Sequence, residues 1–120
     1  MRHLSVEGLA EFMREHPGVR VLDVRFAHEH IAGHLQGDHN VPWYTPDWAP
    51  DPDFMVRVRE RLSPHDYVVV VCSSGNLSCQ AAARLEQAGF GHVYTVLGGY
   101  EDIRQARRAD HAKGIHGTPF

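Results

Sequence analysis

The stretch Val68-Val69-Val70-Val71-Cys72-Ser73-Ser74-Gly75-Asn76-Leu77-Ser78 joins an apolar run to a cysteine and then to small, polar residues. The four valines are β-branched and consecutive, which indicates a strand buried on both faces. The alanine-rich segment 79–88 that follows predicts a helix. A strand that ends at Cys72 and turns directly into a helix places the sulfur at the carboxyl edge of a sheet, where ligands bind in open α/β folds.

The start of a helix supplies unpaired N–H groups and a partial positive charge. Both stabilise a thiolate rather than a thiol, so Cys72 is the candidate nucleophile. The dipole offers at most about 2 kcal/mol, whereas each well-aimed N–H to a charged acceptor offers about 1.5–3 kcal/mol. We therefore expect several backbone N–H groups to hold the anion, with Gly75 allowing the turn an unusual backbone angle.

Regular spacing of apolar residues predicts further elements around this stretch. Strands are expected at 19–24, 40–42, 68–72 and 93–97, and helices from the Ser5 cap to Pro17-Gly18 and at 27–35, 54–62, 79–88 and 100–108. Strands that alternate with helices indicate an α/β fold, a mostly parallel central sheet of about five strands with helices on both faces. Residues 1–120 should form a single domain, with a core at about 4–108 and a loosely ordered tail at 109–120.

The bulk numbers exclude several classes of protein. The chain has 120 residues, enough for one core, and a net charge of −3, which argues against a nucleic-acid partner. No apolar run approaches the roughly 18 residues of a membrane span, and the start of the chain carries no apolar signal core. With two cysteines and no secretion signal, we expect a reducing, cytoplasmic location.

Four stretches carry a family resemblance in the right order and spacing. They are Leu22-Asp23-Val24-Arg25; Ile31-Ala32-Gly33-His34-Leu35, followed by Gly37 and Asn40-Val41-Pro42; Val71 to Ser78; and Leu97-Gly98-Gly99-Tyr100. The chain resembles a single-domain rhodanese, a rhodanese-like sulfurtransferase, from about Leu4 to Arg108. It departs from the family pattern because residues 73–78 carry no charge, Leu77 stands where arginine is frequent, and Asp38 stands where alanine is common.

The resemblance implies a sulfurtransferase with two half-reactions. The Cys72 thiolate takes the outer sulfur of a donor such as thiosulfate, and the resulting persulfide passes that sulfur to cyanide or a thiol. No metal or organic cofactor is implied. The active-site loop that binds substrate would be Ser73, Ser74, Gly75, Asn76, Leu77 and Ser78. Without a charge in this loop we expect a high KM for thiosulfate, so a protein persulfide or a small persulfide is an alternative donor.

Other residues leave alternatives open. Arg25 can meet an anionic donor, support the loop, or simply pair with Asp23 or Glu29. Cys79 is either a small core residue or a thiol that resolves the persulfide. Tyr100, after two glycines that allow close approach to the loop, is expected to be structural, although contact with substrate is open. The aromatic loop 42–53 either packs on the core or lines a site.

His30 and His34 are four residues apart on an expected helix, a spacing that can bind zinc. No Cys pair or Glu completes a ligand set, so we expect no metal site. A phosphatase or arsenate reductase of the cysteine-loop type is disfavoured because its arginine, six residues after the cysteine, would fall at Ser78. A non-catalytic rhodanese-like interaction module remains the alternative to an enzyme, and the retained Cys72 argues against it.

Overall fold

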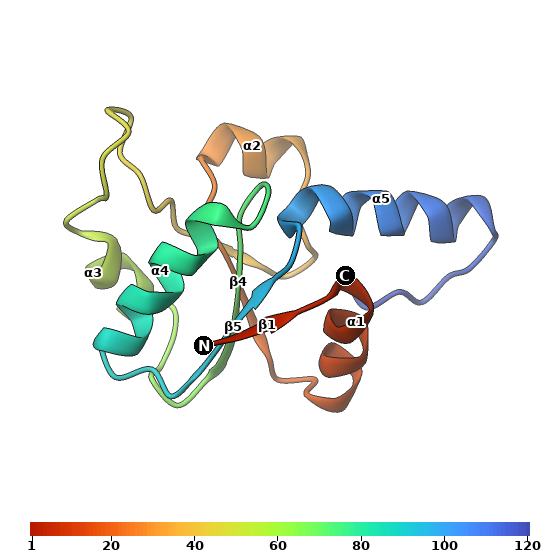
Figure 1. Cartoon of the computed structure of the whole chain (residues 1–120), viewed down its shortest axis with the longest axis horizontal. Helices are drawn as coiled ribbons and strands as arrows, with labels where there is room; N and C mark the ends of the chain where they lie inside the picture. The colour runs from red at the N-terminus through yellow and green to blue at the C-terminus, as the bar shows by residue number, and fades with distance from the viewer.

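The computed structural model describes all residues, 1–120, and contains one five-stranded sheet (Figure 1). All four strand pairings are parallel, and the strand order is β1-β5-β4-β2-β3. The strands are β1 (Arg2–Leu4), β2 (Arg20–Asp23), β3 (His39–Asn40), β4 (Tyr67–Val71) and β5 (His92–Val96). The helices are α1 (Val6–Glu15), α2 (Ala27–Ala32), α3 (Phe54–Arg59), α4 (Asn76–Gln87) and α5 (Gly99–Ala112). The predicted α/β fold with a parallel sheet is confirmed.

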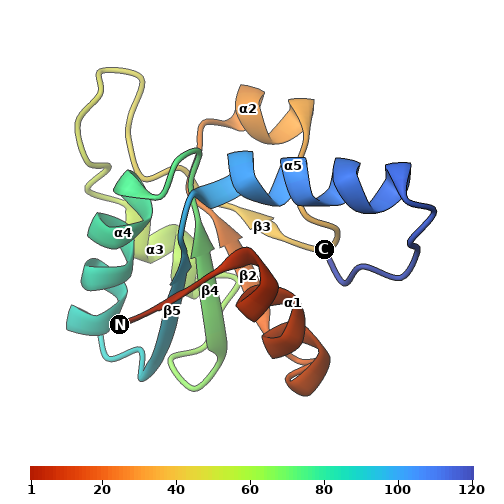
Figure 2. The same cartoon turned by 45° about the vertical axis from the view of Figure 1, so that its right-hand side comes forward.

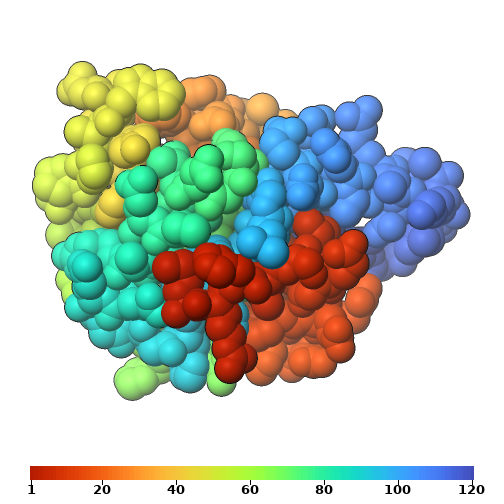
Figure 3. All heavy atoms as spheres, viewed as in Figure 1, coloured from red at the N-terminus to blue at the C-terminus, as the bar shows by residue number.

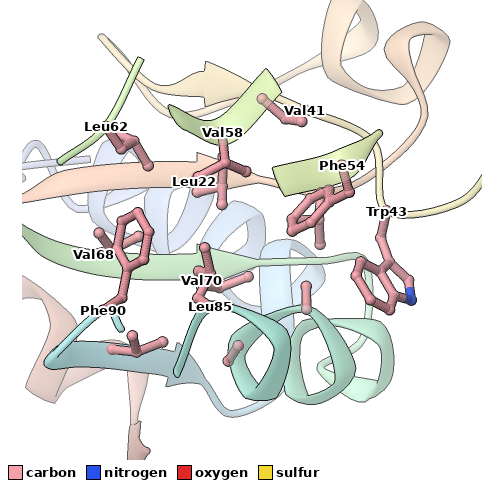
Figure 4. Packing of buried hydrophobic residues seen from close by; sticks show 14 of the residues in the cluster. Leu22, Val41, Trp43, Phe54, Val58, Leu62, Val68, Val70, Leu85 and Phe90 are labelled. Atoms are coloured by element: carbon pink, nitrogen blue, oxygen red, sulfur yellow. The ribbon is translucent and has the colours of Figure 1, made fainter. Parts of the chain in front are cut away.

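Strand β4 lies at the centre of the sheet and divides the core in two. Val68, Val70 and Cys72 belong to the cluster that α3 and α4 cover, together with Phe54 and Leu85 (Figure 4). The intervening valines of β4 face the other way, into a second cluster. Because successive side chains of a strand point to opposite faces, the unbroken valine run buries both. The helices therefore cover both faces of the sheet, as predicted.

Helices α1 and α5 cover the second face. This smaller cluster contains Leu9 of α1, Val69 and Val71 of β4, and Tyr100 and Ile103 of α5. Ser5 begins α1 as expected, since its side chain accepts a hydrogen bond from the N–H of Gly8 at 2.9 Å. None of the five helices has the length and apolar character that a bilayer crossing requires.

The two ends of the chain differ from the prediction. Strand β1 was not predicted, because its three residues include two exposed ones and show no apolar alternation. Helix α5 continues to Ala112 instead of ending at 108, and the tail then turns back beneath it (Figure 2). Phe120 is buried in the second cluster, and Thr118 donates a hydrogen bond to Asp110. The description of residues 109–120 as loosely ordered is therefore wrong.

The carboxyl ends of the parallel strands lie at one edge of the sheet. Figures 1 and 2 both place α2 and the starts of α4 and α5 at this edge. The strand that follows β2 in sequence, β3, lies on one side of it, whereas the strand that follows β4, β5, lies on the opposite side. The order therefore changes direction between β2 and β4, and ligands of open α/β sheets bind beyond such a point.

Candidate active site

Cys72 lies at this point, directly after β4. Its side chain is buried, with 2 % exposed, and its Sγ accepts a hydrogen bond from the backbone N–H of Gly75 at 2.9 Å. Gly75 has φ +99° and precedes the first residue of α4. A left-handed backbone at this position turns the chain back over the sulfur, which a residue with a side chain rarely allows. The unusual backbone angle predicted for Gly75 is confirmed.

Only one backbone N–H of the loop contacts Sγ, whereas several were expected. The N–H groups of Ser74, Asn76, Leu77 and Ser78 make no hydrogen bond within the protein. Three of these belong to the first turn of α4, where N–H groups lack partners inside the helix and point out of its N-terminus. The loop therefore keeps unused donors, and a partial positive charge, beside the sulfur.

The start of α5 keeps the carbonyl groups of the loop occupied. The N–H of Tyr100 donates to the Cys72 carbonyl at 2.7 Å, and the N–H of Glu101 donates to the Ser73 carbonyl at 3.1 Å. A Cβ at Gly99 would lie 2.4 Å from the Cys72 carbonyl oxygen, so only glycine permits this approach. The expectation that paired glycines bring α5 against the loop is confirmed. These two hydrogen bonds fix the loop to the start of α5 through main-chain atoms.

The side chains of the loop contribute less than its backbone. Ser78 is buried and its hydroxyl donates to the Gly75 carbonyl at 3.0 Å, while the Ser73 hydroxyl donates to Glu29 at 2.9 Å. Ser74 and Asn76 are exposed, and Leu77 packs against the core. No guanidinium is present in the loop, and the position that a cysteine-loop phosphatase needs for one holds the buried Ser78.

Arg25 is buried, with 6 % exposed, and its guanidinium is engaged by protein groups. It donates to both carboxylate oxygens of Asp23, at distances between 2.7 and 3.1 Å, and to the Gly33 carbonyl at 2.6 Å. It also stacks over the Tyr100 ring at 4.1 Å. Burial alone would lower the pKa of Arg25, but the hydrogen bond and charge of Asp23, with smaller contributions from Glu29 and Tyr100, raise it. Of the alternatives open for Arg25, the structure supports the pair with Asp23.

A pocket opens between the corner that joins β2 to α2 and the Cys72 loop. Phe26, Tyr44, Trp48 and Leu77 form its apolar wall. Tyr44 and Trp48 come from the 42–53 loop, whose yellow atoms form an upper corner of the molecule in Figure 3. Trp43 of the same loop packs edge-on against a core phenylalanine. Both alternatives for this loop therefore hold, because Trp43 packs on the core while its neighbours line a pocket.

The polar edge of this pocket is formed by Arg25, Glu29 and Ser73. Glu29 was not among the predicted site residues, and neither was Phe26 or Trp48. The position of Glu29 one turn into a helix that follows β2 is the signal that could have indicated it. Its carboxylate reaches both the Ser73 hydroxyl and, at 3.3 Å, the backbone N–H of Phe26.

Two further candidates are clarified by their contacts. Tyr100 is buried between Arg25 and Arg107, and Arg107 hydrogen-bonds its hydroxyl, so its contacts are structural. Cys79 is a free, half-buried thiol, and its Sγ lies 3.5 Å from the Gly75 carbonyl. Cys79 does not belong to either core cluster, and no disulfide joins it to Cys72.

His30, His34 and Asp38 form the one cluster of ligand-type side chains that could hold a metal ion. The Asp38 carboxylate, 1 % exposed, lies 2.7 Å from His30 Nε2 and 3.1 Å from His34 Nδ1, and the two rings stack. From the sequence we expected a third metal ligand to be a cysteine pair or a glutamate. In the structure the third ligand-type side chain is instead an aspartate, Asp38. Both histidines contact Oδ1 of Asp38, whereas Oδ2 is buried without a hydrogen-bond partner.

Together these observations define an α/β protein with a cysteine at the carboxyl end of its central strand, beneath the N-terminus of a helix. A family model for the rhodanese-like domain matches residues 5–106. Thiosulfate sulfurtransferase 16, chloroplastic, of Arabidopsis thaliana is 37 % identical over 86 residues, 69 % of this chain and 72 % of that protein. Thiosulfate sulfurtransferase GlpE of Pseudomonas putida is 36 % identical over 102 residues, 85 % of this chain and 84 % of that protein. The chain belongs to the rhodanese-like family, as its motifs predicted.

Solved structures agree with this assignment. A rhodanese-related protein of Thermoplasma volcanium superposes with a TM-score of 0.66 at 26 % identity, over 88 % of this chain and 93 % of that one. A rhodanese-like domain from an Anabaena protein gives 0.73 at 22 % identity, over 88 % and 75 %. Some relatives are longer, since this chain covers 47 % of rhodanese-like domain-containing protein 15, chloroplastic, of Arabidopsis thaliana, at 34 % identity. The family and the names of these relatives support a sulfurtransferase.

Proposed function

We propose that this protein transfers sulfane sulfur through a persulfide on Cys72. In the first step the Cys72 thiolate attacks the outer sulfur of thiosulfate, the sulfur–sulfur bond of the donor breaks, and sulfite leaves with the electron pair. In the second step cyanide or a thiolate attacks the outer sulfur of the persulfide. The bond to Sγ then breaks and Cys72 regains its thiolate. Neither step requires a metal or an organic cofactor.

The observation that carries this proposal is the arrangement of N–H groups around Sγ. One donor, from Gly75, contacts the sulfur at 2.9 Å, and the N–H groups of the first α4 turn, which directly follow it, have no partner in the protein. A persulfide carries its negative charge on the outer sulfur, beyond Sγ. Unpaired backbone donors next to a thiolate suit that charge, because each is worth about 1.5–3 kcal/mol to an anion. They stabilise it without a general base.

The donor and the acceptor are proposed from the relatives, two of which are named thiosulfate sulfurtransferases. We expect a high KM for thiosulfate, because residues 73–78 carry no charge and Arg25 is paired with Asp23. A small or protein-bound persulfide is then a further donor. A reducing compartment such as the cytoplasm fits two cysteines that remain free thiols.

Intact-mass spectrometry after incubation with thiosulfate tests the proposal. The protein should gain the mass of one sulfur atom, and cyanide should remove it as thiocyanate. Cys72→Ser should gain nothing. The matched variant Cys79→Ser should gain the same mass as the unmodified sequence, because Cys79 is not needed for either step. Absence of the adduct with thiosulfate and with organic persulfides would instead support the non-catalytic module.

A further inference from the structure

We propose that the pocket beside the Cys72 loop binds the organic part of a neutral or cationic thiol, and that Glu29 and Trp48 select it over anions. This inference rests on the sulfur transfer proposed above and names the class of substrate that the second half-reaction uses. It is carried by three observations on the pocket: an apolar aromatic wall, an exposed tryptophan in a strained backbone conformation, and a carboxylate that forms no salt bridge.

The aromatic wall gives the pocket an affinity for apolar groups. Phe26, Tyr44 and Leu77 line a space of about 150 Å³ that is open to solvent, a size that suits one aromatic ring. Ser73 and Leu77 belong to the loop that carries Cys72, so the pocket borders this loop on the side of its first residue. Inorganic sulfur donors have no apolar group that could use this wall, whereas organic thiols do.

Trp48 provides the second observation. Its side chain is 71 % exposed, and its backbone has φ +61°, the only residue other than glycine with a positive φ. Such an angle costs about 1–2 kcal/mol in a residue with a side chain. The ring nevertheless stands edge-on to Phe26 at 5.1 Å and near Tyr44 at 6.3 Å. A strained, exposed tryptophan held over a pocket is suited to stack on a bound organic group.

The charges at the pocket provide the third observation. Arg25 forms its salt bridge with Asp23 at 2.7 Å, and Glu29 forms none, so the two carboxylates and the guanidinium together carry a net charge of −1. Glu29 contacts the Ser73 hydroxyl at 2.9 Å, one residue from Cys72. A carboxylate at this place repels a dianion such as thiosulfate and attracts a protonated amine. The preferred partner is therefore a thiol without negative charge.

Transfer of sulfur to such a thiol conserves atoms and electrons. Its thiolate attacks the outer sulfur of the Cys72 persulfide, a new sulfur–sulfur bond forms, and the bond between that sulfur and Sγ breaks. The electron pair remains on Sγ, which regenerates the Cys72 thiolate. The product is the organic persulfide, and no external oxidant or reductant takes part.

Single-turnover decay of the Cys72 persulfide, followed by intact mass, tests the inference with four acceptors. Benzyl mercaptan and 2-mercaptoethanol differ in the aromatic group, and cysteamine and 3-mercaptopropionate differ in charge. Each rate is divided by the rate of the same thiol with a small disulfide, which removes differences in thiol acidity. We expect benzyl mercaptan to exceed 2-mercaptoethanol, and cysteamine to exceed 3-mercaptopropionate, each by roughly tenfold.

Two substitutions assign these preferences to residues. Trp48→Ala should abolish most of the benzyl preference, whereas Val56→Ala, another exposed apolar residue, should preserve it. Glu29→Gln retains the acceptor for Ser73 but should remove the preference for cysteamine and raise kcat/KM for thiosulfate about fivefold or more. The exposed Glu11→Gln on α1 is its control. If the persulfide forms but both preferences survive in the variants, the inference is wrong, whereas absence of the persulfide would refute the proposed function itself.

Discussion

Two turns at the carboxyl edge of the sheet border the site. One contributes backbone N–H groups, and the other contributes charged side chains. The turn after β4 holds Cys72 with backbone N–H groups and carries no charged side chain. The turn after β2 is rich in charge, yet Arg25 donates to Asp23 and to the Gly33 carbonyl, and Glu29 binds Ser73. The first turn keeps its donors free, whereas the second has engaged most of its own.

This difference shows that a charged residue near a site is not the same as a charge available to substrate. In this protein Nε and Nη2 of Arg25 bind Asp23 and the Gly33 carbonyl, which leaves Nη1 as the one guanidinium nitrogen without a partner in the protein. The backbone donors at the start of α4 have no side-chain partner of this kind, since no side chain caps this helix. The uncharged loop, with the unpaired N–H groups of Ser74, Asn76, Leu77 and Ser78, therefore offers more free donors than Arg25 does.

The largest effect is expected where the uncharged turn meets α5. In Gly99→Ala the new Cβ would approach the Cys72 carbonyl oxygen within 2.4 Å, at φ +62°. The loop must move away from α5, and we expect sulfur transfer to fall by about 100-fold, as for other displacements of a reacting group by about 1 Å. Steady-state assays of thiocyanate formation measure this.

Gly89→Ala is the matched control for that substitution. Gly89 also has a positive φ, of +95°, but nothing lies within 4 Å of its Cβ position. It should lose only the strain energy of about 1–2 kcal/mol in unfolding experiments and retain its turnover. Equal activity losses in the two variants would show that the contact between α5 and the loop does not matter.

An intermediate effect is expected in the charged turn. Arg25→Met leaves the Asp23 carboxylate buried without its partner, so the free energy of unfolding should fall by about 3–5 kcal/mol. Arg57→Met removes a pair with Asp51 at the surface and should cost at most about 1 kcal/mol. Chemical denaturation measures both. A stable Arg25→Met protein whose KM for thiosulfate alone rises would reverse the comparison and make Arg25 an anion receptor.

The smallest effect concerns His39, at the start of β3 on the charged side. Burial, and then the nearby Arg20 and Arg61, lower the pKa of His39 below 6.5, its usual value, against the smaller opposing influence of Asp38 and Asp66. The unfolded chain therefore takes up a proton at a higher pH than the folded protein, and stability should be lost as the pH falls below 6.5.

His39→Gln should weaken this pH dependence, measured as the free energy of unfolding between neutral and mildly acidic pH. The change should exceed that of His65→Gln, which alters an exposed histidine. An unchanged pH dependence in His39→Gln would show that the environment of this ring does not differ between the folded and unfolded states.

Much of the fold could be predicted because the spacing of apolar residues and the positions of turn residues indicate the same helices and strands. The valine run of β4 and the glycines before α5 identify the central strand and the close approach of a helix without any structure. β1 could not be predicted, because three residues at the edge of a sheet leave no period to detect. The burial of Phe120 depends on a return of the tail to α1 and α5, which no local pattern records.

The sequence could predict only the part of the site that a single segment of the chain forms. Cys72 and its loop are adjacent in sequence, so their geometry follows from one turn. Glu29 and Trp48 reach the same pocket from separate segments, and their approach is set by the packing of α2 and the 42–53 loop. Asp23 could be predicted as a partner of Arg25, but the additional contacts of the guanidinium with the Gly33 carbonyl and the Tyr100 ring depend on the packing of separate segments.

The way the Cys72 loop is built has a consequence for how such a protein can diversify. The hydrogen bond to Sγ and the contacts to α5 come from main-chain atoms, which any residue supplies so long as the glycines remain. The side chains that select the partner stand on other segments. If the pocket selects the acceptor as we propose, substitutions at Phe26, Glu29 or Trp48 would change the acceptor and leave the main-chain contacts around Cys72 in place, so that selectivity and catalysis would evolve independently.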